Sequence, residues 1–121
     1  MATDKIPELH VETERHENVT LVHCTGQVDL ATWNEFSTKI RALIAEGKSI
    51  RVELANVTRV DSTGIGALVG IWTAARRRNC DLKYINPSKR IEDVMRITAL
   101  LGMLEGHESE ERQLSAAPGA A

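Results

Sequence analysis

Apolar residues follow two different spacings along this chain, and the change of spacing separates the expected strands from the expected helices. Short runs that alternate, or that are dense in Val, Leu and Ile, predict strands, because neighbouring strand side chains point to opposite faces. Four runs have this character: residues 9–12, 19–25, 50–54 and 82–85. Turn residues 16–18 between the first two runs predict a hairpin. Residues 26–29 are then expected to leave the sheet.

Between these runs, apolar residues recur every three to four positions, which is the period of an amphipathic helix. From Ala31 onward the apolar side chains share one face: Phe36, Ile40, Leu43 and Ile44. A second helix is expected over residues 62–78, with an apolar stripe at Ile65, Leu68, Val69 and Trp72. A third is expected after the entry residues 86–88 (NPS), with its apolar face at Ile91, Val94, Met95 and Ile97.

The residues around these helices are typical of helix ends. Asp29 or Thr32 is expected to cap the first helix, and Gly47 suits the left-handed residue that follows it. The run 76–78 (RRR) is expected to close the second helix as a solvated end, because cations suit the negative end of the helix dipole. The alternative is a contact for an acidic partner or RNA. The second helix contains three glycines, Gly64, Gly66 and Gly70. Because glycine is a poor helix former, several in one helix indicate the close approach of another backbone or a partner.

The order of elements is β-β-α-β-α-β-α, which predicts an α/β fold: a small mixed sheet covered by helices, with right-handed parallel crossovers. The sheet is expected to have four or five strands, the fifth a short one at residues 103–105. One domain is expected over residues 8–114, ending in one or two helical turns at 108–114, with flexible tails at 1–7 and 115–121.

Composition fits one globular domain and excludes several other classes. The chain has 121 residues, 42% of them apolar, and a net charge of −2, which excludes a wholly disordered chain. That charge supplies no general basic surface for nucleic acid, and aromatic residues are too scarce for a platform on which bases stack. The uncharged stretch 62–75 is too short and polar to span a bilayer.

The start of the chain shows no apolar targeting segment, so we expect a cytoplasmic protein. Cys24 and Cys80 lie in apolar surroundings and are expected to be free thiols packed in the core. Trp33 is expected to be a half-buried packing residue, or else an exposed partner contact.

Known catalytic patterns are missing from the sequence, and we expect neither an enzyme nor a protein with a cofactor or metal. The four histidines show no metal-ligand spacing, and no serine or cysteine lies in a nucleophile elbow. There is no phosphate-binding loop for nucleotide hydrolysis. The glycines at 64, 66 and 70 do not have the spacing of a dinucleotide-binding loop, and a second mononucleotide-binding half is lacking.

The most unusual segment is VDSTGIG at residues 60–66, in which an acid and two hydroxyls precede a glycine-bearing helix. Asp61 or Ser62 could serve as the helix cap. Alternatively, the segment could be a modification or docking site, because a phosphate at a helix start would lie on free backbone amides. Such a phosphate would add about −1.5 to −2 charges beside Asp61.

The segment VELANVTRVDSTGIGAL at residues 52–68 resembles the STAS domains of bacterial anti-sigma-factor antagonists, whose hallmark reads roughly L-D-L-S-x-V-x-x-I-D-S-S-G-L-G. Residues 26–29 (GQVD) resemble the family's G-E-L-D, and the arginine-rich end of the second helix precedes a strand as in the family. The segment from Asn86 to Leu100 resembles S-P-x-V-x-x-x-L-x-x-T-G-L. The resemblance covers about residues 9–114.

The resemblance implies a binding module that is switched by phosphorylation. Family members bind an anti-sigma factor that is also a serine kinase, and this frees the sigma factor for transcription. The kinase phosphorylates the serine after the motif's aspartate, here Ser62, which ends binding; a phosphatase restores it. The phosphate would be repelled by Asp61 and Asp29. The resemblance places the partner-binding surface at Asp29, Asp61, Ser62, Thr63, Gly64 and Gly66.

Several residues depart from the family pattern and bear on the partner more than on the fold. Thr63 replaces the commoner second serine and is a rival phosphorylation site. The other departures are Gln27, Glu53, Ala55, Arg59 and Ala99, the last standing where glycine is usual. The alternative function is a STAS adaptor subunit of a transport or signalling complex, with no sigma factor involved. In that case Ser62 would only cap its helix.

Overall fold

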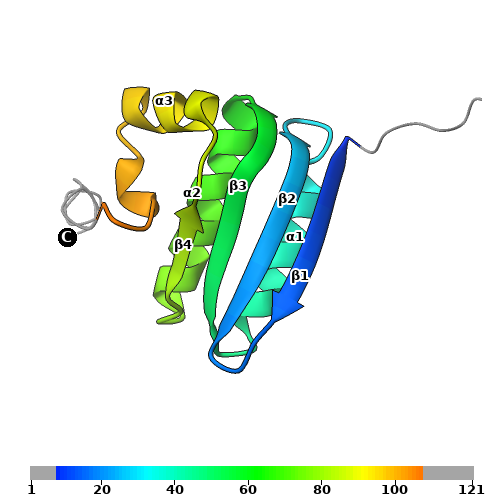
Figure 1. The fold of residues 1–121 in the computed structure, drawn as a ribbon, viewed down its shortest axis with the longest axis vertical. Helices are drawn as coiled ribbons and strands as arrows, with labels where there is room; N and C mark the ends of the chain where they lie inside the picture. Colours follow the sequence, from blue (N-terminus) through cyan, green and yellow to red (C-terminus); the bar gives the residue numbers. More distant parts are fainter. Residues whose placement is uncertain (1–7, 108–121) are drawn as a thin grey trace, which may run out of the picture.

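The computed structural model describes residues 8–107, which contain four strands and three α-helices in the expected order (Figure 1). The elements are β1 (Leu9–Arg15), β2 (Val19–Val28), α1 (Trp33–Ile44), β3 (Ser49–Val60), α2 (Ser62–Arg77), β4 (Leu82–Ile85), α3 (Lys89–Ile97) and a 3₁₀ turn, η1 (Leu101–Met103). The expectations for 1–7 and 108–121 concern residues outside the described range.

The sheet has the strand order β1-β2-β3-β4, with β1 antiparallel to β2 and the other pairs parallel. Helices α1 and α2 lie side by side on one face, while α3 lies across the end of the sheet beside β3 (Figure 1). The parallel strands β2, β3 and β4 finish at this same end. The segments that follow them are therefore brought together, which is where α/β sheets commonly place functional sites.

Three strands are longer than the sequence pattern predicts. β1 continues three residues beyond the expected 9–12, to Arg15. Residues 26–28 do not leave the sheet but continue β2, and residues 55–60 continue β3 instead of forming a loop. The extensions of β2 and β3 pair with each other, with Val28 opposite Val60 and register shifts on the way. Gly26 has φ of 116°, and a Cβ there would lie 2.2 Å from the Glu8 carbonyl oxygen. The pairing between the ends of β2 and β3 is non-local, so the alternation of side chains along one strand does not predict it.

The buried face of α2 also differs from the predicted stripe. Ile65 and Val69 are only half-buried. Three of the buried residues of α2 are small, and three are large. The six are Gly64, Ala67, Leu68, Ile71, Trp72 and Ala75. A Cβ on Gly64 would lie 2.0 Å from the Val28 carbonyl oxygen, so α2 crosses β2 in direct backbone contact. The expected close approach of another backbone is thus confirmed at Gly64, and it turns the small side chains inward.

The C-terminal part corrects two further expectations. Ile97 is 83% exposed rather than on the apolar face of α3. Residues 103–105 form no strand, because η1 is followed only by a single bridge between Leu104 and Tyr84. Ala99 has φ of 61°, a left-handed conformation that favours glycine. Ala99 therefore occupies a position where glycine would have less backbone strain.

The core is mainly aliphatic, as the scarcity of aromatic residues predicts, and the rings of Phe36 and Tyr84 are fully buried in it. The Tyr84 hydroxyl donates to the Leu68 carbonyl of α2 at 2.7 Å, which satisfies the buried polar group. Both cysteines are free: Cys24 is buried, and its burial raises the thiol pKa to about 12, whereas Cys80 is partly buried. The prediction of core thiols is confirmed fully for Cys24.

Candidate functional site

The junction between β3 and α2 is organised by the carboxylate of Asp61. Asp61 is the N-cap of α2, and its Oδ1 accepts the Gly64 amide proton at 2.8 Å. Its Oδ2 accepts the Leu30 amide proton at 3.1 Å, which fixes the β2–α1 loop against the start of α2. These backbone bonds, led by the one from Gly64, lower the pKa of Asp61. Of the two residues expected as caps, Asp61 therefore makes the cap.

The loop between β2 and α1 carries a second acid in a local turn. Asp29 Oδ1 accepts the amide protons of Ala31 at 3.0 Å and Thr32 at 3.2 Å. Thr32 is the N-cap of α1, but its hydroxyl makes no capping bond and instead donates to the Gln27 carbonyl at 2.7 Å. Asp29 thus supplies the bonds at the start of α1, and the loop holds it at the same end of the sheet as Asp61.

The two hydroxyls that follow Asp61 have different surroundings. Ser62 is exposed at the first position of α2, whereas Thr63 is half-buried. The amides of Thr63 and Gly64 already bond to Asp61. Contrary to expectation, an added phosphate on Ser62 would therefore find these donors occupied, and its charge would lie beside the Asp61 carboxylate.

The glycines of α2 fall into two kinds. Gly64 is buried against β2, which is a packing role. Gly66 is exposed, and a Cβ built on it meets nothing within 4 Å. Glycine in a helix interior costs roughly 0.5–1 kcal/mol relative to alanine. No contact within residues 8–107 explains Gly66, whereas a partner approaching this turn of α2 would.

Two exposed apolar side chains lie next to this junction. Leu30 is 73% exposed, and Trp33, at the start of α1, is 39% exposed. The expectation that Trp33 is a half-buried packing residue is therefore wrong, and its ring is exposed as the alternative requires. The exposure of Leu30 could not be predicted from the sequence, because an isolated leucine in a turn belongs to no apolar period. Its position one residue after Asp29 is the feature of the sequence that points to it. Leu30 and Trp33 add apolar contact area to an otherwise polar site.

The face of the sheet turned away from α1 and α2 carries a polar network that the sequence analysis also missed. His23 in β2 contacts Glu53 at 3.0 Å through Nδ1 and Glu14 at 3.1 Å through Nε2. Both carboxylates, Glu53 first, raise the pKa of His23, and the histidine in turn lowers theirs. The Asn86 amide also donates to Glu53 at 3.2 Å. Among residues 8–107, no group of three or more candidate ligands could hold a metal.

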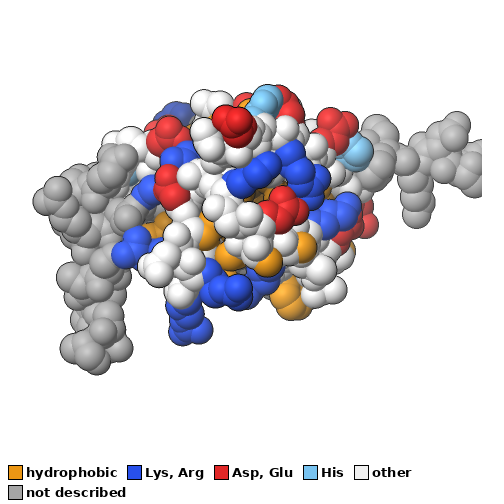
Figure 2. Space-filling view, turned by 90° about the horizontal axis from the view of Figure 1, so that it is seen from below, with side chains coloured by type: hydrophobic (Ala, Val, Ile, Leu, Met, Phe, Trp, Pro, Cys, Tyr) orange, Lys and Arg blue, Asp and Glu red, His pale blue; other side chains and the backbone are white. Residues whose placement is uncertain are grey.

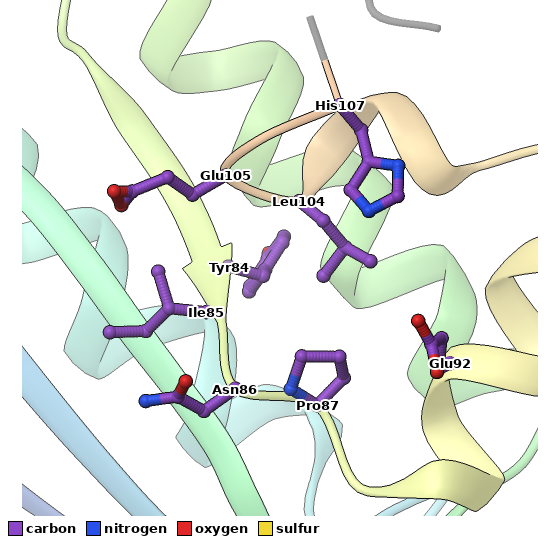
Figure 3. A pocket seen from close by; sticks show the side chains of 8 residues that line it. All are labelled: Tyr84, Ile85, Asn86, Pro87, Glu92, Leu104, Glu105 and His107. Carbon is purple, nitrogen blue, oxygen red and sulfur yellow. The ribbon is translucent and has the colours of Figure 1, made fainter.

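A hollow of about 340 Å³ lies where β4 ends (Figure 3). Its ionisable side chains, Glu92, Glu105 and His107, are spread around it instead of converging (Figure 3). Glu105 bonds to Arg51 at 2.8 Å. Among residues 8–107, the side chains that line the hollow therefore include no paired nucleophile and base.

The opposite end of the molecule carries the C-terminus of α2. Figure 2 looks onto this end, where Lys and Arg side chains are mixed with carboxylates. Arg76, Arg77 and Arg78 are exposed, and the Arg76 guanidinium lies 4.8 Å from the Trp72 ring centroid. This arrangement agrees with the expected solvated helix end.

Comparison with known proteins assigns the family. Residues 10–112 match the family model described as STAS domain. This chain belongs to the STAS-domain family. Within its described residues, the STAS domain has no helix long and apolar enough to cross a membrane.

Curated relatives of this STAS domain are named for one role. The anti-sigma-B factor antagonist of Staphylococcus epidermidis is 32% identical over 104 residues, which are 85% of this chain and 96% of that protein. The anti-sigma-B factor antagonist of Bacillus subtilis is 28% identical over 97 residues, 80% of this chain and 89% of that protein.

Solved structures share the STAS fold at lower identity. The anti-sigma factor antagonist SpoIIAA in its unphosphorylated form superposes with a TM-score of 0.66 at 17% identity, over 89% of this chain and 98% of that one. SpoIIAA of Bacillus in the phosphorylated form superposes with a TM-score of 0.62 at 18% identity, over 86% of this chain and 99% of that one. The murine anion transporter Slc26a9 matches with 0.65 at 16% identity, over 80% of this chain but 16% of the transporter.

Proposed function

We propose that this STAS domain is an anti-sigma-factor antagonist. It binds an anti-sigma factor with serine-kinase activity, which releases a sigma factor, and phosphorylation of Ser62 ends the binding. The domain itself is a binding module without catalysis, and a phosphatase returns it to the binding form. The names of the curated relatives support the antagonist role.

The observation that carries the proposal is that the cap of α2 and the exposed hydroxyl belong to different residues. Asp61 makes the cap, so the exposed hydroxyl of Ser62 is not needed to hold the helix. A kinase could therefore reach and modify Ser62 without breaking a structural bond. The rival hydroxyl of Thr63 is half-buried, which favours Ser62 as the acceptor.

The surroundings of Ser62 also support a partner surface that a phosphate would disrupt. Leu30 and Trp33 supply exposed apolar area, and the uncovered turn at Gly66 leaves room for a closely packed partner. Asp61 and Asp29 are already anionic. A phosphate desolvated in this interface would have unfavourable electrostatics, which typically costs several kcal/mol.

The test compares wild-type, Ser62→Asp and Ser62→Asn chains as baits in an extract of the cells that make the protein, with mass spectrometry of retained proteins. We expect the wild type to retain a serine kinase and Ser62→Asp to lose it, with an affinity loss of at least ~2 kcal/mol by calorimetry. Ser62→Asn is the matched control, because it has the size of the aspartate without its charge, and it should still retain the kinase. Incubation with the recovered kinase and ATP should phosphorylate the wild type but not Ser62→Ala.

Equal affinity of the wild type and Ser62→Asp for the recovered kinase would contradict the switch. A second candidate function, a fixed adaptor in a larger assembly, is favoured by the similarity of this fold to a part of Slc26a9. It would be supported if both baits retained the same transporter or scaffold protein and no kinase.

A further inference from the structure

The end of the sheet that carries Ser62 also holds a groove, between the end of β3 and α3. We define the Arg59–Arg90 groove by its four lining residues: Arg59, Val60, Arg90 and Val94. Its volume is about 380 Å³. Val60 is only two residues before Ser62, so the Cα atoms of these two residues lie within about 7 Å of each other.

The groove is cationic, with no acid among its lining residues. The other cations of α3 are neutralised locally, since Lys89 and Arg96 each lie 3.0 Å from Asp93. Arg90 makes only a long contact, 3.5 Å, to the Thr58 carbonyl. Arg59 helps lower the pKa of Asp61, but within residues 8–107 neither groove arginine forms an ion pair. On a chain of net charge −2, these two cations are left available for an anionic partner.

One wall of the groove continues into exposed apolar surface. Arg90, Val94 and Ile97 are spaced i, i+4 and i+7, so they share one face of α3. Ile97 is 83% exposed, and it extends the apolar surface of α3 beyond the half-buried Val94. The groove therefore combines positive charge at one end with an apolar contact at the other.

We propose that the Arg59–Arg90 groove receives an acidic, partly apolar segment of the protein that docks at Ser62. Carboxylates of that segment pair with Arg59 and Arg90, and its apolar residues pack on Val94 and Ile97. Arginine suits this task, because its guanidinium pairs with carboxylates through two hydrogen bonds. The proposal rests on the proposed function for the identity of the partner, and it assigns α3 as a second contact beside α2.

The test places the photo-crosslinking residue benzoylphenylalanine at Ile97 of the full chain, which is then irradiated in an extract of the producing cells. We expect the crosslinked peptide to contain Asp or Glu beside apolar residues. Arg59→Gln with Arg90→Gln should reduce the crosslink yield about tenfold, as loss of complementary charge at an interface does. Lys89→Gln with Arg96→Gln is the matched control, because it removes the same charge from α3 outside the groove and should leave the yield unchanged.

Absence of a crosslink, a peptide without acids, or equal yields from the two double variants would overturn the proposal. Should the arginines instead hold the phosphate of modified Ser62, the groove substitutions would leave the yield unchanged and shift the phosphorus resonance of the phosphorylated chain. That result also overturns it. Adding Ser62→Asp separates the two proposals: a crosslink that survives this change but depends on Arg59 and Arg90 contradicts the Ser62 switch and supports the groove.

Discussion

Asp61 and Ser62 are neighbours in the chain whose side chains do unrelated things. The carboxylate of Asp61 is used on both oxygens, by the Gly64 amide of its own helix and by the Leu30 amide of another loop. Ser62 is exposed. Asp61 thus stabilises the start of α2, while the hydroxyl of the neighbouring Ser62 is accessible from solvent.

This separation predicts different effects of substituting each residue with alanine. Asp61→Ala removes the acceptor for two backbone amides and should lower the urea midpoint clearly. Ser62→Ala removes no cap, so it should change the free energy of unfolding by less than about 0.5 kcal/mol. Urea unfolding of both variants checks this. A larger loss for Ser62→Ala than for Asp61→Ala would assign the cap to Ser62.

The sequence predicted that Asp61 or Ser62 caps α2, but it did not decide between the two. Aspartate and serine are about equally good N-caps, so residue type alone left both open. Only the strand extension to Val60 decides it, because it sets where α2 begins. The exposed Leu30 escaped for a related reason: its exposure depends on how a loop is tied to a distant residue.

At the scale of an element, α2 uses its glycines for two purposes. Gly64 lets the helix touch the backbone of β2, and Gly66 leaves an exposed turn bare. Because the two lie only two residues apart in one helix, the same substitution at each position separates packing from surface function.

Gly64→Ala should destabilise the fold by about 3 kcal/mol or more, since its Cβ would overlap a backbone carbonyl that cannot move aside. Gly66→Ala should stabilise it by up to ~1 kcal/mol through helix propensity. The same Gly66→Ala chain should bind its partner more weakly. Urea unfolding and calorimetry measure the two effects, and unchanged partner affinity for Gly66→Ala would mean that no partner packs on that turn.

The elements themselves were predictable where side chains carry the signal. The pattern of β4 gave residues 82–85, and Ser88 was expected and found at the start of α3. The face of α2 was misjudged because Gly64, Ala67 and Ala75 carry little hydrophobic signal although they pack closest. The end of β3 was missed because Asn56, Thr58 and Arg59 break the alternation.

At the scale of the whole molecule, His23 ties several elements together on the uncovered face of the sheet. Its ring nitrogens reach Glu14 in β1 and Glu53 in β3, and Glu53 is also bonded by Asn86 after β4. The network thus joins β1, β2 and β3 to the residue that follows β4.

This network predicts a pH window for stability. The folded pKa of His23 is raised above 6.5, so its contribution is complete below about pH 6.5 and is lost as the pH rises through the raised value. Glu14 and Glu53 have pKa values lowered from 4.5, so their contribution is present above about pH 4.5 and is lost as the pH falls through the lowered values.

The stability difference between the wild type and His23→Gln should therefore be largest between about pH 4.5 and 6.5. Urea unfolding at several pH values measures this difference. In an NMR titration, His23 should titrate above 6.5 in the wild type and closer to 6.5 in Glu53→Gln. A His23 titration unaffected by Glu53→Gln would show that the network does not form.

The family could be predicted from one motif, residues 60–66, which hold the acid, the hydroxyl and the glycine in sequence. The same motif contains Ser62, the residue for which we propose the switch. The groove between β3 and α3 could not be predicted, since Arg59 and Arg90 lie 31 positions apart and meet only after the chain has crossed the sheet. Partner specificity of this kind depends on the complete fold.

The cap made by Asp61 has a consequence for the life of the protein in the cell. Proteases cut chains in proportion to how often they unfold, so a modification that weakened the fold would also shorten the half-life. If Ser62 is the switch that we propose, its modification would leave the cap intact, and both forms would have similar lifetimes. The pool of the protein would then be conserved through each cycle, and a response could be reversed without new synthesis.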